Sequence, residues 1–369
     1  DQNQPRADQL SCSAFHRNAL LIGPNLGTCD AGCDAGSGQA NQVFFMTSTL
    51  QTGLEHNHIG KCPISPYVSG LCSLFFNKAC AMSATLSSSS TPDPQRSLTL
   101  IRLWLFGLAA LVFAMVVVGG ATRMTGSGLS ITEWKPVLGA LPPMSEQDWL
   151  SEFEKYKAIS QYSLLNSQMQ LPEFKSIYWW EWGHRQLGRF IGLVFAVGYI
   201  GLYAAGHIRG RRALAFLGLG ILGGLQAFVG WIMVASGLKP GMTAVEPVRL
   251  MLHLTLASLI YALLITTATA LKPRADSVKP VHAKMARVLL ILSLVQIALG
   301  ALVAGNHAGL IYNTWPMMDG HFLPEVVFSD WQNKGAEAFF DGIAFVQFNH
   351  RVGAYILLAV ALLHAAQVS

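Results

Sequence analysis

Six long apolar runs constrain this chain more than any other feature of its sequence. They cover residues 101–120, 184–206, 213–235, 250–271, 286–304 and 350–368. Each run has about the 20 residues that a helix needs to cross the hydrocarbon core of a bilayer. Hydrophobic residues make up 52% of the 369-residue chain and charged residues only 12%, whereas soluble domains carry about 25% charged residues. The runs therefore predict an all-α, polytopic membrane protein with six spans.

The loops between the runs predict how the chain is oriented in the membrane. Residues 207–212 contain three arginines, and residues 272–287 contain five Lys or Arg against one acid. By the positive-inside rule, both loops face the cytoplasm or the mitochondrial matrix. The long loops at 121–183 and 305–349 carry many acids and are expected to face outward. Because the basic residues cluster in short loops, the net charge of +5 does not indicate a nucleic-acid partner.

The first 81 residues differ from the rest of the chain. They contain all six cysteines, so the membrane part uses neither disulfides nor thiolate ligands. Cys29 and Cys33 precede two histidines, but their spacing fits no standard zinc pattern. The segment has no periodic helix and no recognisable secretory signal. We expect a natural start near Met82 and a disordered extension over residues 1–97.

An internal repeat relates the two halves of the membrane part. Residues 128–134 are echoed by residues 309–315, and the pair His184-Arg185 is echoed by His350-Arg351. Each copy consists of an apolar run, a long outer loop and a second apolar run that opens with His-Arg. The spacing indicates two homologous helical units.

The repeat also predicts the domain organisation. Residues 98–272 contain four spans and are expected to form an amino-terminal four-helix bundle. Residues 273–369 contain two spans, so we expect them to form an incomplete carboxyl-terminal bundle. The predicted fold is two pseudo-symmetric four-helix bundles, of which the second is truncated.

One short stretch, residues 181–188, combines polar groups that are rare at a membrane boundary. In a helix, Glu181, His184, Arg185 and Gly188 share one face. An acid, an imidazole and a guanidinium are costly there unless something is bound. A glycine one turn beyond the histidine leaves space for a flat, bulky ligand, so this face is predicted to hold a haem.

The positions of the histidines favour the same ligand. His184 opens the second predicted span and His253 lies three residues into the fourth, and both spans run from outside to inside. Two imidazoles at matched depth can bind one haem iron from opposite sides. His350 lies at the same depth in the second unit, and His307 is a weaker alternative ligand. His364 is 14 residues beyond His350, about 21 Å along a helix, and is interpreted as an inner-interface residue.

Three charged residues beside these histidines each have two interpretations. Glu181 either pairs with Arg185 or another cation, or acts as an acid/base group beside the haem, where a partly dry carboxyl suits proton transfer. We favour the catalytic interpretation of Glu181. Arg185 and Arg351 either bind haem propionates in a two-pronged fashion or extend to the outer interface.

Five motifs together resemble the haem A synthase family, in the type shared by proteobacteria and mitochondria. They are residues 119–130, the Glu-x-x-His-Arg motif at 181–185, the Leu-His-Leu motif at 252–254, residues 309–317 and the Asn-His-Arg triplet at 349–351. The resemblance covers about residues 98–368.

The resemblance implies an activity and assigns residues to it. The family has eight transmembrane helices in two bundles and oxidises a ring methyl of haem O to a formyl, which gives haem A for cytochrome oxidase. His184 and His253 match the histidines of the substrate bundle, and Glu181 matches the glutamate that the family needs. The second bundle of the family holds haem b through two histidines, of which only His350 has a counterpart here.

The resemblance also implies partners and a location. Haem O and membrane lipid are implied directly. Haem O synthase, an electron donor such as ferredoxin and a second copy of the chain are compatible with it. The expected location is the bacterial plasma membrane or the mitochondrial inner membrane.

The chain departs from the family pattern in two places: helices seven and eight are missing, and residues 1–81 have no counterpart in the family. The outer-loop cysteine pair of some bacterial members is also absent, as it is in the type that the chain resembles. Two alternatives to the enzyme remain. The histidines alone fit a dihaem b-type electron carrier equally well, and a chain with an incomplete second bundle could be inactive.

Overall fold

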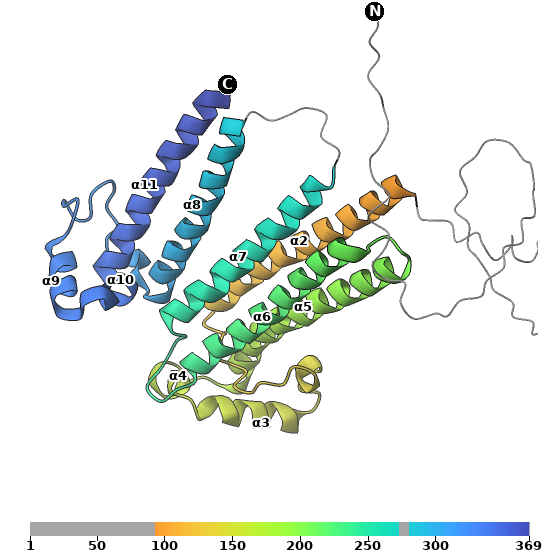
Figure 1. The fold of residues 1–369 in the computed structure, drawn as a ribbon. Helices are drawn as coiled ribbons and strands as arrows, with labels where there is room; N and C mark the ends of the chain where they lie inside the picture. Colours follow the sequence, from red (N-terminus) through yellow and green to blue (C-terminus); the bar gives the residue numbers. More distant parts are fainter. Residues whose placement is uncertain (1–92, 273–279, 369) are drawn as a thin grey trace, which may run out of the picture. The chain divides into compact units, whose positions relative to one another are not determined.

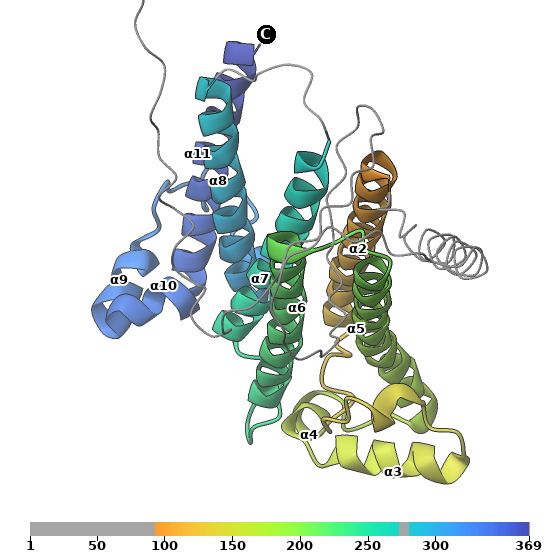
Figure 2. The same cartoon turned by 45° about the vertical axis from the view of Figure 1, so that its right-hand side comes forward.

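The computed structural model describes residues 93–272 and 280–368, all within one compact unit, residues 81–369. Six helices in this part are long and apolar enough to cross a membrane (Figures 1 and 2). They are α2 (Pro94–Met124), α5 (Leu171–Ala204), α6 (Gly210–Gly237), α7 (Pro247–Ala270), α8 (Pro280–Gly305) and α11 (Ile343–Val368). No strand occurs among the described residues. The predicted all-α, polytopic membrane fold with six spans is confirmed.

The first four long helices form a closed ring of helix contacts. Helix α2 contacts α5 and α7, and α6 contacts α5 and α7. Helix α8 packs against both α7 and α11. Residues 1–92 of the extension predicted for residues 1–97 lie outside the described residues. Helix α2 begins at Pro94, within the predicted extension, and the Asp93 side chain caps it by accepting a hydrogen bond from the Gln95 amide.

Two helices begin well before the apolar runs that signalled them. Helix α5 starts at Leu171, not near residue 184, because Gln170 and Glu173 form a capping box there and Pro172 stands in the first turn. Helix α11 starts at Ile343, not at residue 350. The prediction that the histidines open their helices was therefore wrong. Both lie inside a helix, which fixes their side chains more firmly than a helix end would.

Short helices form an outer layer over the ends of the long ones. They are α3 (Glu146–Lys157), α4 (Ser160–Leu165), α9 (Glu325–Lys334) and α10 (Ala338–Asp341), with short 3-10 turns between them. Aromatic side chains of α3 and the early turns of α5 form a buried cluster. Within it, the rings of Phe153 and Phe174 stack with their centroids 4.9 Å apart. This contact explains why α5 extends beyond its apolar run.

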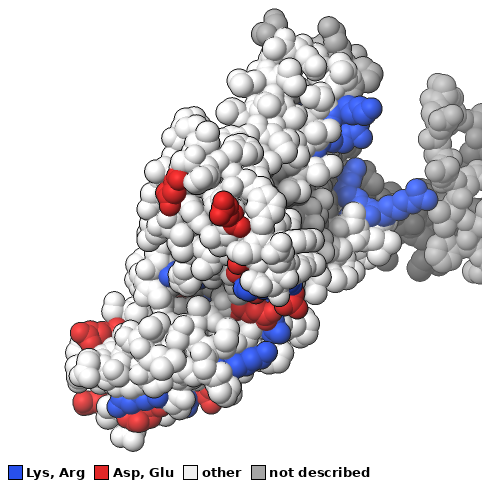
Figure 3. Space-filling model, turned by 90° about the vertical axis from the view of Figure 1, so that its left-hand side faces the viewer, with Lys and Arg blue, Asp and Glu red and all other residues white. Residues whose placement is uncertain are grey.

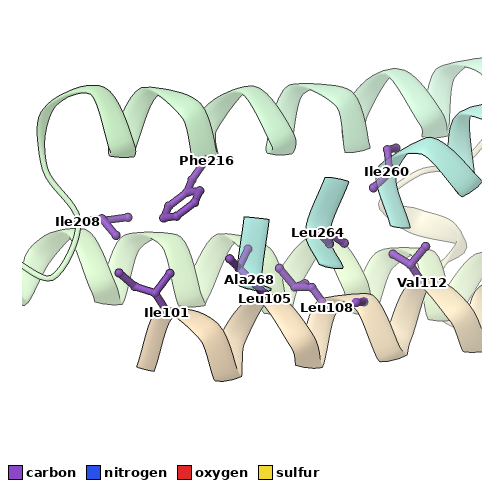
Figure 4. Packing of buried hydrophobic residues seen from close by; sticks show 10 residues of the cluster. Ile101, Leu105, Leu108, Val112, Ile208, Phe216, Ile260, Leu264 and Ala268 are labelled. Atoms are coloured by element: carbon purple, nitrogen blue, oxygen red, sulfur yellow. The ribbon is translucent and has the colours of Figure 1, made fainter. Parts of the chain in front are cut away.

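The first four long helices enclose a hydrophobic core in the half that lies away from the outer layer (Figure 4). Its ten buried residues are Ile101, Leu105, Leu108, Ala109, Val112, Ile208, Phe216, Ile260, Leu264 and Ala268. Phe216 of α6 is 2% exposed and packs edge-on against Trp104 of α2. The core therefore closes the inner half of this bundle, the half next to the arginine-rich loop at residues 207–212.

Charged side chains are distributed unevenly over the surface. On the face shown in Figure 3, acidic side chains lie toward the end that carries α3 and α9, and Lys and Arg alone appear toward the opposite end. This distribution agrees with the orientation that the loops predict, with the outer layer away from the cytoplasm or matrix.

The outer layer contains an ion-pair network that should respond to acid. The Glu133 carboxylate lies 2.5 Å from Lys135 Nζ and 2.7 Å from Lys155 Nζ. Hydrogen bonds from Lys135 and Lys155 lower the pKa of Glu133 from its usual 4.5. A carboxyl with a lowered pKa stabilises the fold above its unfolded pKa, and this contribution is lost as pH falls through the folded value.

We therefore expect amide hydrogen exchange in the loop around Glu133 to accelerate below about pH 4.5, relative to exchange in the long helices. Exchange measured by mass spectrometry across pH 3 to 6, corrected for the intrinsic rate, checks this. In Glu133→Gln, this loop should already exchange fast at pH 6. An identical pH profile in parent and variant would show that the pairs do not hold the loop.

Candidate functional site

The predicted ligands His184 and His253 lie on α5 and α7, two helices that both pack against α2. Each imidazole faces a glycine of another helix. A Cβ atom on Gly119 of α2 would lie 3.1 Å from His184 Nε2, and a Cβ atom on Gly230 of α6 would lie 2.7 Å from His253 Cε1. Larger residues at these two positions would push the rings aside. The glycines thus make room for the imidazoles inside the bundle.

Few side chains near the two histidines are fully buried. On α2, no residue between Val112 and Thr122 is buried. On α5, no residue after Glu181 is buried, and on α7 none precedes Ile260. His184 and His253 thus lie between the hydrophobic core and the outer layer, and neither histidine is part of these two clusters. Two imidazoles, their glycine neighbours and the scarcity of fully buried side chains at this level fit a flat group such as haem.

Glu181 lies one turn before His184 and is almost completely buried, with 3% of its surface exposed. Its Oε2 accepts hydrogen bonds from the Ser130 hydroxyl at 2.8 Å and from the Ile131 amide at 2.7 Å. Its Oε1 lies 2.6 Å from an Arg185 guanidinium nitrogen. The ion pair that was one of the two interpretations of Glu181 is present. The carboxylate is held at a fixed position by three groups.

Arg185 connects this carboxylate to the outer loop. Besides pairing with Glu181, its guanidinium donates to the carbonyl of Ile131 at 2.7 Å and to the carbonyl of Glu133 at 3.0 Å. All three of its side-chain nitrogens are engaged within the chain. The structure therefore gives Arg185 the role of a clamp on the loop, and propionate binding stays a prediction.

The second half contains the same clamp. Arg351 of α11 donates to the carbonyl of Tyr312 and, at 2.8 Å, to the carbonyl of Thr314. These two acceptors are the repeat counterparts of Ile131 and Glu133. The structure thus shows that the sequence repeat corresponds to one loop-and-arginine arrangement built twice.

The two copies differ at the buried acid. The position that Glu181 holds in the first copy is held in the second by Gln347, three residues before His350. Gln347 is buried like Glu181, but it is neutral, and its amide nitrogen donates at 3.3 Å to the carbonyl of Tyr312. A buried carboxylate next to a candidate iron ligand occurs only in the first of the two copies.

The remaining histidines divide between the two ends of the helices. His350 faces Gly300 of α8, where a Cβ atom would lie 3.0 Å from the ring. His364 lies near the carboxyl end of α11, and its ring centroid is 6.3 Å from that of His282 near the start of α8. This position agrees with the inner-interface interpretation of His364. His307 lies in the loop after α8, outside the helices.

Sequence reasoning missed three side chains that the structure brings to these groups. They are Ser130, which bonds to Glu181, and the two glutamines Gln226 and Gln296, which bond to His253 and His350. A signal for the glutamines exists, since each is a lone amide in an apolar run and is followed four residues later by glycine.

Removing the clamp should destabilise the fold. In Arg185→Ala, the Glu181 carboxylate stays buried without its cation, which we expect to lower the free energy of unfolding by about 3 kcal/mol. Lys157→Ala is a suitable control, because its ion pair with Glu154 is exposed and should contribute much less. Thermal unfolding of both variants in detergent compares them. Equal losses would mean that Glu181 does not need its partner.

The chain matches the COX15-CtaA family, described as cytochrome oxidase assembly protein, over residues 102–369. A haem A synthase of Methylobacterium sp. (strain 4-46) is 56% identical over 266 residues, 72% of this chain and 74% of that protein. The haem A synthase of Azorhizobium caulinodans is 48% identical over 76% of this chain and 80% of that protein. That of Brucella ovis is 45% identical over 77% of this chain and 78% of that protein.

No solved structure shows a significant match to the chain. The family match and the relatives confirm the resemblance that the five motifs indicate, and with it the predicted function, haem A synthesis for cytochrome oxidase. The chain belongs to the COX15-CtaA family of cytochrome oxidase assembly proteins, the family of the haem A synthases.

Proposed function

We propose that the chain is an oxidoreductase that binds haem O between α5 and α7 and oxidises its ring methyl to the formyl of haem A. The observation that carries this proposal is the buried carboxylate of Glu181, one turn before His184. The second copy of the same arrangement has Gln347 instead. A group that can exchange a proton is thus present in one half and absent from the other, as expected if only the first half performs chemistry.

The residues of the first half would divide the work as follows. His184 and His253 bind the iron of haem O from opposite sides and fix the plane of the ring. Glu181 accepts or donates a proton at its carboxylate beside that ring, or stabilises charge there while the methyl is oxidised. Arg185 keeps this carboxylate in place through the loop clamp. The four-electron oxidation of methyl to formyl would proceed through the haem iron, with dioxygen or the second haem as the electron acceptor and dioxygen or water as the source of the formyl oxygen.

The second half would serve electron transfer. We assign residues 98–272 to the substrate bundle and residues 273–369 to the second bundle, where His350 is one ligand of a haem b. The absence of a buried acid at Gln347 supports a haem that stays chemically unchanged there. Electrons would pass between this haem b and the substrate bundle.

The location and partners follow from the same proposal. The relatives described above are bacterial, which favours the bacterial plasma membrane over the mitochondrial inner membrane. Haem O reaches the site from the membrane, in the vicinity of a haem O synthase. An electron donor such as ferredoxin and a second copy of the chain are further candidate partners.

The test is expression of the chain in cells that make haem O but have no haem A synthase of their own. Haems extracted from the membranes are separated by chromatography and identified by mass. We expect haem A, or its hydroxylated precursor, with the chain and none with the empty vector. Haem O and haem b left unchanged, with haem bound to the purified chain, would favour the dihaem electron carrier instead.

A further inference from the structure

Two glutamines in the apolar helices contact histidines on the next helix. The amide nitrogen of Gln226 on α6 lies 3.0 Å from the backbone carbonyl of His253, 3.1 Å from its Nδ1 and 3.4 Å from its Nε2. The amide nitrogen of Gln296 on α8 lies 2.9 Å from the backbone carbonyl of His350, 2.9 Å from its Nδ1 and 3.4 Å from its Nε2. Each glutamine thus bridges the main chain and the ring of one histidine, which restricts rotation of the imidazole.

Each glutamine is followed four residues later by the glycine that faces the same ring. Gly230 follows Gln226, and Gly300 follows Gln296. A Cβ atom on Gly230 would lie 2.7 Å from Cε1 of His253, and one on Gly300 would lie 3.0 Å from Cε1 of His350. On the helix next to each histidine, a glutamine and a glycine one turn apart therefore share one face and contact the imidazole.

The glycine in this arrangement is a copy produced by the repeat, since Gly300 aligns with Gly119, but the glutamine is not. Aligning residues 128–134 with residues 309–315 pairs α8 with α2, and places Met115 at the position of Gln296. Helix α6 has no counterpart in that alignment. The same contact therefore arises on two helices that the repeat does not relate. Among the described residues, no hydrogen bond to the ring of the third candidate ligand, His184, is present, so two of the three histidines have this partner.

The chemistry of the amide indicates what the contact does. An amide nitrogen only donates, and in both rings it lies closer to Nδ1 than to Nε2, so we assign Nδ1 as the acceptor and the ring proton to Nε2. Iron needs the lone pair of Nε2, which moves the proton to Nδ1, and that N–H then needs an acceptor. The Oε1 atoms of both glutamines are buried and have no hydrogen-bond partner within the described part of the chain. Rotation of the amide would supply that acceptor.

We propose that Gln226 and Gln296 are positioning residues for His253 and His350. Their amide nitrogens hold the free imidazoles, and their Oε1 atoms accept the Nδ1 proton once Nε2 binds haem iron. The proposal rests on the proposed function, because it takes both histidines as iron ligands.

The test uses the full-length chain with His350→Ala, so that only the site at His253 remains, and haemin as the probe. Haemin is titrated into the purified protein, and the reduction potential of the bound haem is measured by spectroelectrochemistry. Gln226→Met keeps the length of the side chain but removes the acceptor. We expect it to weaken haemin binding about 10- to 100-fold and to raise the potential, because the histidine becomes a weaker donor.

Gln226→Glu should have the opposite effect on the potential, since a carboxylate is a stronger acceptor for the Nδ1 proton. Ser258→Ala is the matched control on α7, because this hydroxyl bonds only to the backbone of its own helix, and its potential should equal that of the parent. Potentials that are unchanged in both Gln226 variants, or shifted in the same direction, would overturn the proposal. Haemin binding that survives His253→Ala unchanged would instead overturn the ligand assignment itself.

Discussion

Glu181→Gln is expected to abolish most haem A formation while haem O remains bound. The substitution keeps the size of the side chain and an oxygen that can accept from Ser130 and Ile131, as the wild-type carboxylate does at 2.8 and 2.7 Å. It removes the group that exchanges a proton. A lost general acid or base typically costs about 10²- to 10⁴-fold in rate. The ratio of haem A to haem O in extracts of the purified variant measures the effect.

The chain provides two safeguards for this experiment. Gln347 shows that a buried glutamine is compatible with the same loop-and-arginine arrangement in the second half, so the variant should fold. Glu173→Gln makes the same chemical change on the same helix, at a residue that caps α5, and should leave haem A formation intact. Haem A production in Glu181→Gln equal to that in Glu173→Gln would remove Glu181 from the mechanism.

His184→Ala and His253→Ala should each prevent the chain from retaining haem O through purification. Each variant deletes one of the two proposed axial ligands, and the opposite histidine alone leaves the iron with one bond to the protein. The content of haem O per protein, measured after extraction, reports the loss. Because α5 and α7 both pack against α2, helix packing should survive, and circular dichroism checks it.

Two further histidine variants separate ligation from a general effect. His207→Ala removes a histidine whose ring contacts Ser97 at 2.8 Å, next to the inner core, and should retain haem O. His350→Ala should lose haem b but keep haem O. If haem O were lost equally from all four variants, the loss would reflect misfolding, and the site between α5 and α7 would lose its support.

The spans and the resemblance were predictable because they rest on long or specific patterns. An apolar run of about 20 residues has few alternatives to a membrane helix. The beginnings of α5 and α11 were not predictable in the same way. Residues 171–183 are mixed in polarity, and their helix is stabilised by the capping box at Gln170 and Glu173 and by contacts with α3. Apolar periodicity marks where a helix enters the membrane and not where it starts.

The candidate site was predictable only in part for a similar reason. The helical spacing of Glu181 and His184 placed them on one face, and the structure keeps them one turn apart. The partners of Glu181 could not be read in this way, because Ser130 is 51 residues away along the chain. The contact between Gln226 and His253 joins two helices whose rotation the sequence does not fix. Contacts within a helix follow from spacing, whereas contacts between helices depend on packing.

The measurement that tests the central claim most directly is the ligation state of haem O bound to the purified chain. In the His350→Ala variant, which isolates the first bundle, ferric haem O is added and its electron paramagnetic resonance spectrum is recorded. The account predicts a low-spin, six-coordinate iron with two imidazole ligands, which disappears in both His184→Ala and His253→Ala. A high-spin spectrum, or a low-spin spectrum that survives either substitution, would contradict the placement of the substrate between α5 and α7.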